Sequence, residues 1–204
     1  WVVSMSYQGP YAVSLRAVCV FFFTRRGGHT RRESFLWARR CVKETGLNRE
    51  RSDARRYPAI HPLDSWSKYP GMVDAKQVEE ARDVLRRGNE VNQMMKVVGE
   101  EGTSIEDFVM FLKSEFLDAA YLQQNSFHDV DAATDADRQT YVFAKIHKIL
   151  HARMFFPDKD AARRWFLQLT AVTKDWNLVL MKSPEFKQLE ERLDGMLAEV
   201  LENA

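Results

Sequence analysis

Cysteine is scarce in this sequence, with only Cys19 and Cys41 among 204 residues. Two cysteines cannot build a disulfide framework, and neither lies in a CxxC or Cys/His spacing that would hold zinc. A chain of 204 residues that is 45% hydrophobic is long enough for one well-buried core. We therefore expect one main domain that resides in a reducing compartment.

Long uninterrupted apolar runs are also missing. The run at residues 11–23 is broken by Arg16 and is too short to cross a bilayer as a helix. Its positive charges, Arg25 and Arg26, follow the apolar stretch, whereas a secretory signal carries them before it. The sequence therefore predicts no direct membrane insertion.

The net charge of +1 hides a division within the chain. Residues 1–56 carry 12 Lys and Arg against 4 Asp and Glu, whereas residues 57–204 carry 18 against 25. Such asymmetry indicates a basic arm for an acidic partner or two segments of different origin. Residues 1–48 begin at Trp1 rather than Met, which indicates a fragment or a processed product. They lack helix or strand periodicity, and only about 32–48 regain a helix-compatible composition. We interpret 1–48 as an atypical basic extension, either out of frame or disordered, and 49–204 as the folded helical domain.

Helical periodicity dominates from Asp74 onward. Asp74 is a suitable N-cap for a first long helix and Gly99 a suitable end for it. Thr103 and Glu106 have the spacing of a capping box, which predicts a second helix over about 104–122. Strand signals are nearly absent, so we predict an all-α helical bundle.

Capping residues also mark the three helices expected in the second half. Thr134 or Asp135 would begin one helix, and Asp158 or Asp160 the next. The last would begin at Ser183 and Pro184, an N-cap followed by an N1 proline. On the first of these helices, the predicted inward face consists of Tyr141, the stem of Lys145, Ile149 and Ala152.

Two motifs identify a family resemblance. Residues 56–67, RYPAIHPLDSWS, resemble the RHFPAINW segment of the catalytic A subunits of vacuolar/archaeal-type rotary ATPases and the YPAVDPLDSTS segment of F-type β subunits. Residues 121–131, YLQQNSFHDVD, resemble the FLQQNAFHxVD segment of A subunits. Between them, residues 99–107, GEEGTSIED, resemble the acidic lever loop DELSEED of β subunits. The resemblance covers about 49–204 and implies the C-terminal helical domain of an A subunit.

The resemblance implies an adenine-binding role for five residues. Tyr57 and Tyr121 would face each other across the adenine, with Phe127 closing the pocket and Pro58 fixing the backbone after Tyr57. Gln124, within three consecutive amides, would read the edge of the base. Stacking on aromatic rings contributes about 1–3 kcal/mol per base at single-stranded nucleic-acid sites. Without the resemblance, the tyrosines would be core aromatics and the amides a polar helix end.

The resemblance also implies partners and cofactors. Glu100, Glu101, Glu106 and Asp107 would contact the central-stalk rotor subunit, although an acidic helix N-terminus is ordinarily a solvated turn. The complete subunit would bind ATP or ADP with Mg²⁺ and alternate with B subunits in a hexamer. That hexamer would couple ATP hydrolysis or synthesis to H⁺ or Na⁺ transport. It would be cytoplasmic and peripheral to the membrane, with no nucleic-acid partner.

A phosphate-binding loop of the form GxxxxGK[ST] is absent from the sequence. The loop's backbone amides and lysine hold the nucleotide phosphates. We therefore expect no catalytic residue here, no ATPase activity from this chain alone, and no cofactor for it alone.

His147 and His151 are spaced i and i+4, which can clip a metal ion. No glutamate takes the HExxH position, and no third ligand is evident from the sequence. We therefore expect a surface or packing role and no metal. A metal hydrolase built on these histidines has little support.

The alternative to the ATPase interpretation of the whole chain is a free-standing helical interaction module without a nucleotide role.

Overall fold

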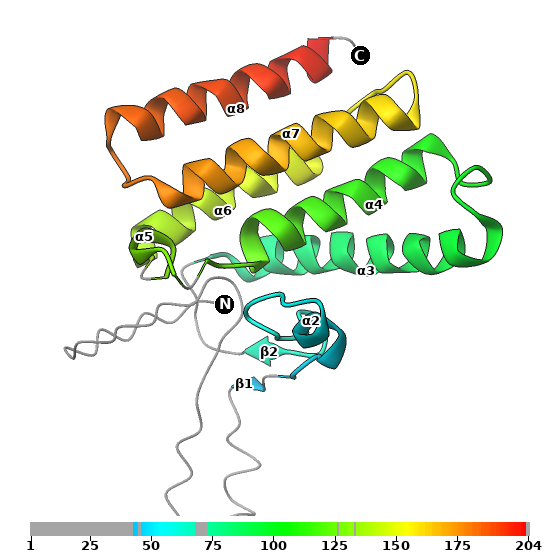
Figure 1. Ribbon diagram of the computed structural model, residues 1–204, viewed down its shortest axis with the longest axis horizontal. Helices are drawn as coiled ribbons and strands as arrows, with labels where there is room; N and C mark the ends of the chain where they lie inside the picture. The colour runs from blue at the N-terminus through cyan, green and yellow to red at the C-terminus, as the bar shows by residue number, and fades with distance from the viewer. Residues whose placement is uncertain (1–42, 45, 68–72, 126, 133, 203–204) are drawn as a thin grey trace, which may run out of the picture.

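The computed structural model describes residues 43–44, 46–67, 73–125, 127–132 and 134–202. Within these ranges the expected all-α architecture is confirmed, because long helices lie side by side and a small segment at the N-terminal end packs beside them (Figure 1). Most of the segment 1–48, interpreted from the sequence as an atypical basic extension, falls outside the described residues.

The segment from residue 43 to residue 67 is built from short elements. Strand β1 (Lys43–Glu44) pairs antiparallel with β2 (Trp66–Ser67), so the helix-compatible composition before Asn48 does not produce a helix at 43–44. Helix α2 (Arg49–Asp53) begins at Asn48, whose side-chain oxygen accepts a hydrogen bond from the Arg51 amide at 3.0 Å. These elements place the RYPAIHPLDSWS motif beside the helices.

Helix α3 (Ala75–Val98) begins and ends where the sequence predicts. Asp74 accepts a hydrogen bond from the Lys76 amide at 3.3 Å, and Gly99 ends the helix with a φ of 87°. That left-handed φ favours glycine because it has no Cβ. Met94 and Val98 continue the apolar periodicity of the sequence but are 41% and 61% exposed, so the fully buried stripe ends at Val91.

Helix α4 (Ile105–Leu117) continues into a π-helical turn, η1 (Asp118–Leu122), which confirms the helix predicted over 104–122. The predicted capping box is wrong by one residue. Ser104 is the N-cap and accepts from the Asp107 amide at 3.1 Å, while the Thr103 hydroxyl donates to the Gly99 carbonyl at 3.2 Å. Thr103 is buried, so its hydroxyl closes the turn between the helices instead of capping α4.

After the short helix α5 (Asp129–Ala132), helix α6 (Ala136–His151) begins at Asp135, one of the two predicted caps. Its predicted inward face is partly wrong. Tyr141 is 40% exposed, and Lys145 pairs with Asp194 at 2.8 Å on the side facing α8. The face that enters the core consists of Val142, Phe143, Ile146, Ile149 and Leu150.

Helices α7 (Lys159–Leu178) and α8 (Pro184–Glu202) complete the bundle. Asp158 accepts from the Ala161 amide at 2.5 Å, and Ser183 accepts from the Phe186 amide at 3.1 Å, so both predicted caps are confirmed. Helix α4 packs between α3 and α7, and α8 packs on the outer side of α7 (Figure 1). The largest fully buried apolar side chains are Trp176, Phe108, Phe116, Leu117, Ile146, Ile149, Leu169 and Leu193.

No helix among the described residues is both long enough and apolar enough to span a membrane.

Candidate functional site

The structure brings together the two motifs that carry the adenine-binding prediction. The backbone amide of Gln124 donates to the carbonyl oxygen of Tyr57 at 2.9 Å. Residues 56–67 and 121–131 are therefore neighbours, although more than 60 residues of chain separate these two atoms. The contact lies where η1 ends and the chain leaves α4.

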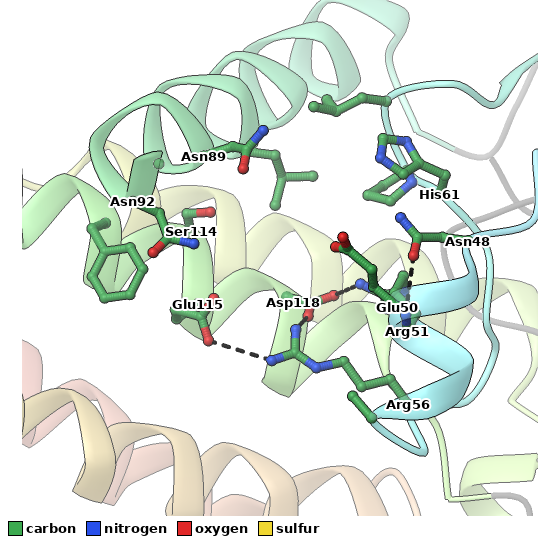
Figure 2. Close-up of a pocket in the computed structure, with 16 residues that line it drawn as sticks. Asn48, Glu50, Arg51, Arg56, His61, Asn89, Asn92, Ser114, Glu115 and Asp118 are labelled. Carbon is green, nitrogen blue, oxygen red and sulfur yellow. Dashed lines mark hydrogen bonds and ion pairs between the residues drawn. The ribbon is translucent and has the colours of Figure 1, made fainter. Parts of the chain in front are cut away.

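An ion-pair clamp holds the first motif against this end of α4. The guanidinium groups of Arg51 and Arg56 both donate to the carboxylate of Asp118, the first residue of η1 (Figure 2). Asp118 is only 6% exposed, and Arg56 also lies 3.7 Å from Glu115. Charge-assisted hydrogen bonds of this kind are stronger than neutral ones. We call Arg51, Arg56 and Asp118 the clamp.

Helix α3 contributes a second anchor for the same segment. Arg82 donates to the carbonyl oxygens of Leu63 at 2.7 Å and Ser65 at 2.6 Å. Beside the clamp lies a hollow of about 340 Å³, lined by polar and apolar residues of α2, α3, α4 and η1 and of the loop at 61–63 (Figure 2). The segment is therefore held on two sides, and the backbone that precedes and follows Tyr57 is fixed.

The predicted adenine-binding aromatics differ in exposure. Tyr57 is 43% exposed and Phe127 is 97% exposed, so both rings are available to a ligand. Pro58 is buried. Tyr121 is 3% exposed, and its ring centroid lies 5.3 Å from that of Phe143 in the core. Tyr121 therefore lies in the core in this structure.

Gln124 is also buried, and its amide nitrogen donates to the Asp131 carbonyl at 3.1 Å. The carboxylate of Asp131 accepts from the Asn125 amide at 2.7 Å, and the side-chain oxygen of Asn125 accepts from the Phe127 amide at 3.1 Å. These bonds set the shape of the loop that presents Phe127. Sequence reasoning missed Asp131, whose only signal was its place inside the second motif.

Of the four predicted rotor-contacting residues, Glu100 and Glu101 lie in the turn between α3 and α4, and Glu106 and Asp107 lie in the first turn of α4, at its other end. The carboxylate of Glu100 is paired with Arg163 at 2.6 Å, and its carbonyl accepts from Lys159 at 2.5 Å. Asp107 accepts from the Ser104 hydroxyl at 2.7 Å. Glu101 and Glu106 are exposed. Glu100 and Asp107 thus stabilise the turn and the start of α4, and Glu101 and Glu106 face solvent.

The end of α3 adds an apolar surface to this acidic turn. Met94, Val97 and Val98 are 41%, 87% and 61% exposed. Neighbouring exposed apolar side chains beside charged residues are typical of a protein-binding surface. We call these three residues and Glu101 the α3 tip.

Comparison with known proteins identifies relatives of this sequence. Residues 75–155 match the family model described as the C-terminal domain of V and A type ATP synthase. The V-type ATP synthase alpha chain of Borrelia garinii is 53% identical over 152 residues, which cover 74% of this chain and 26% of that protein. The alpha chain of Treponema denticola is 53% identical over 154 residues, covering 76% and 26%. The chain thus spans about a quarter of the length of these relatives.

A solved structure described as a unique ATP synthase subunit, NeqB from Nanoarchaeum equitans, matches 55% of this chain and 29% of its own with a TM-score of 0.46 and 18% identity. A likeness of that size carries no argument about function. The family match and the two alpha chains identify the family from sequence. Residues 75–155 belong to the family of C-terminal domains of V and A type ATP synthases, and the chain is a relative of V-type ATP synthase alpha chains.

Proposed function

We propose that this chain supplies the adenine-side wall and the rotor-contacting helical domain of a catalytic A subunit in a rotary ATPase. The observation that carries the proposal is the 2.9 Å bond between Gln124 and Tyr57, which joins the two motifs shared with A subunits. The complete subunit couples ATP hydrolysis or synthesis to the transport of H⁺ or Na⁺. The phosphates and Mg²⁺ are held by a part of the subunit that this sequence does not contain.

At the adenine-side wall, the exposed rings of Tyr57 and Phe127 stack on the base. Tyr121 lies in the core, where its ring packs against Phe143. Stacking needs rings with fixed positions, because mobile side chains lose conformational entropy when they bind. The clamp and the hydrogen bonds of the Phe127 loop hold the backbone that carries these two rings.

Helix α4 connects the two functional ends. Its 13 residues span about 20 Å at 1.5 Å per residue, with the α3 tip at its start and the adenine-side wall at its end. A rigid helix transmits a displacement along its length. Movement of the wall on nucleotide binding therefore moves the α3 tip, which pushes on the central stalk, while B subunits form the rest of the hexamer.

The adenine-side wall is tested in the assembled hexamer by measuring ATP and GTP dissociation constants. Tyr57→Ala should weaken both by roughly 5- to 150-fold, the equivalent of about 1–3 kcal/mol for one stacked base. Tyr57→Phe, which keeps the ring, is the matched control and should change little. Unchanged affinities for Tyr57→Ala, with the fold intact by circular dichroism, would return Tyr57 to the role of a structural aromatic.

The same measurement addresses the amides. Gln124 is buried and bonded to Asp131, whereas Gln123 is only partly buried. If either amide reads the edge of the base, its replacement by Ala alters the ratio of ATP to GTP affinity. If neither does, the ratio stays constant and discrimination between the bases lies elsewhere in the subunit.

The rotor contact is tested by binding of the central-stalk subunit to the hexamer. Val97→Asp places a charge in the α3 tip and should weaken binding by about tenfold or more, as expected for a buried interface residue. Leu180→Asp is the matched control, because Leu180 is 66% exposed and follows the C-terminal end of α7, whereas the N-terminal end of α7 is the one that pairs with Glu100. Equal effects of both substitutions would contradict the assignment of the tip.

A further inference from the structure

A cluster of metal-ligating side chains lies outside the adenine-side wall and the α3 tip. His147 and His151 project from α6, and Glu80 approaches them from α3. The two histidines alone are a pair at helical spacing. Packing of α3 against α6 adds the third ligand from 67 residues away, which the sequence did not reveal.

The distances within the cluster are close to those of a metal site. An Oε2 atom of Glu80 lies 2.8 Å from the Nε2 of His147 and 3.5 Å from the Nε2 of His151. The three donor atoms all lie within 4.8 Å of one another. With Zn–N and Zn–O bonds of about 2.0–2.1 Å, the ligands of a tetrahedral zinc ion are roughly 3.3 Å apart. Two of the three pairs are within about half an ångström of that value, and small side-chain rotations close the third.

We propose that Glu80, His147 and His151 form a binding site for Zn²⁺ that joins α3 to α6. Two imidazoles and one carboxylate are a donor set that zinc uses, with a water molecule in the fourth position. Two nitrogen donors disfavour Mg²⁺ and Ca²⁺, which prefer oxygen ligands. Beside the cluster, a hollow of about 560 Å³ lined in part by Glu80 and His151 leaves room for that water.

Lys113 is a charged neighbour of the cluster and lines the same hollow as Glu80 and His151. Lys113 cannot take the place of the metal, because its ammonium group is bonded to the carbonyls of Leu150 at 2.8 Å and Ala152 at 2.7 Å. Its charge lowers the affinity of the site without blocking it.

Zinc at this position would tie the packing of α6 to that of α3. A ligand that binds only the folded state stabilises it in proportion to the logarithm of its concentration. Zinc should therefore raise the thermal stability of the bundle.

The experiment is a calorimetric titration of the 204-residue chain with ZnCl₂ in the presence of excess Mg²⁺. The expected result is one zinc ion per chain and a higher melting temperature. Loss of a residue that merely orients a ligand weakens metal binding 10- to 100-fold, so Glu80→Gln and His151→Gln should each weaken it by about 100-fold or more. His61→Gln is the matched control. His61 also pairs with a carboxylate, Asp64 at 3.2 Å, but it belongs to no three-ligand group among the described residues.

His151 has a side chain that is 47% exposed, so its replacement should not unfold the chain, and circular dichroism checks this. Substitution by Co²⁺ gives an independent readout, because a four-coordinate cobalt ion with imidazole ligands absorbs visible light. We expect that absorption in the parent chain and in His61→Gln, but not in His151→Gln. The proposal is overturned by absence of zinc binding, or by binding that His151→Gln and Glu80→Gln leave unchanged.

Discussion

We expect substitutions in the clamp that positions Tyr57 to lower the free energy of unfolding by an amount that depends on how buried each ion pair is. Arg49 and Arg51 are both arginines of α2, and each pairs with an aspartate, but their environments differ. The Arg49–Asp53 pair lies at the surface, with side chains 93% and 71% exposed. In the Arg51–Asp118 pair the side chains are 11% and 8% exposed. Because both pairs join an arginine to an aspartate and differ in solvent exposure, comparing them isolates the contribution of burial to stability.

The magnitudes follow from what each substitution leaves behind. Asp118→Ala leaves the guanidinium of Arg51 buried without its carboxylate, and breaking a buried pair in this way costs about 3–5 kcal/mol. Arg51→Ala costs less, about 1.5–3 kcal/mol for a lost charged hydrogen bond, because Arg56 still pairs with Asp118. Arg49→Ala should cost less than about 1 kcal/mol, as exposed ion pairs do.

Urea denaturation of the chain, followed by tryptophan fluorescence, measures the three free energies of unfolding. Hydrogen exchange at the Gln124 amide, which donates to Tyr57, adds a local readout. Exchange there should accelerate in Asp118→Ala and stay unchanged in Arg49→Ala. Equal destabilisation by Arg49→Ala and Arg51→Ala, or unchanged exchange in Asp118→Ala, would refute the role of the clamp.

Three further predictions concern stability and activity. A Cβ at Gly88 would lie 2.1 Å from the Cβ of Ser114, so overpacking should cost about 1–3 kcal/mol, and the helix preference for alanine should reduce the net destabilisation of Gly88→Ala to about 1–2 kcal/mol. A Cβ at Gly195 would meet open space, so Gly195→Ala should stabilise the chain. Equal shifts in melting temperature for the two variants would contradict this. Because the pKa of His151 is lowered in the folded chain, the unfolded chain binds more protons just below pH 6.5. Acidification through that range in metal-free buffer should therefore lower the free energy of unfolding of the parent chain more than that of His151→Gln, as measured by denaturant titration. The chain alone should not hydrolyse ATP, and turnover that copurifies with it and survives Tyr57→Ala would show that the proposed function is wrong.

Local chemistry made the helices and most of their caps predictable from sequence. Asp74, Asp135, Asp158 and Ser183 begin helices because their side-chain oxygens accept from amides two or three residues ahead, and such bonds need no tertiary partner. Thr103 shows the limit of this reasoning. Both it and Ser104 have a hydroxyl at a suitable position, and only the packing of the turn decides which one caps α4.

The sequence named the two segments of the proposed adenine-side wall, and the structure brings them into contact, but the sequence did not distinguish their exposed residues from their buried ones. Tyr57, Tyr121 and Phe127 look alike in a motif, whereas the structure leaves two rings exposed and places Tyr121 against Phe143. The same uncertainty affected α6, where Tyr141 was expected inside. Exposure depends on which neighbouring helix covers a face, and no local pattern contains that information.

By itself, then, the sequence determined helix positions, cap chemistry and the motifs of the family, since each depends on residues within a few positions of one another. Tertiary structure decided how distant charges are paired. Arg51 meets Asp118, and Glu80 meets His147, each across 67 residues of chain. A carboxylate on a helix surface has many possible partners until the chain folds. Packing of helices brings one partner within bonding distance and excludes the water that would otherwise weaken the attraction.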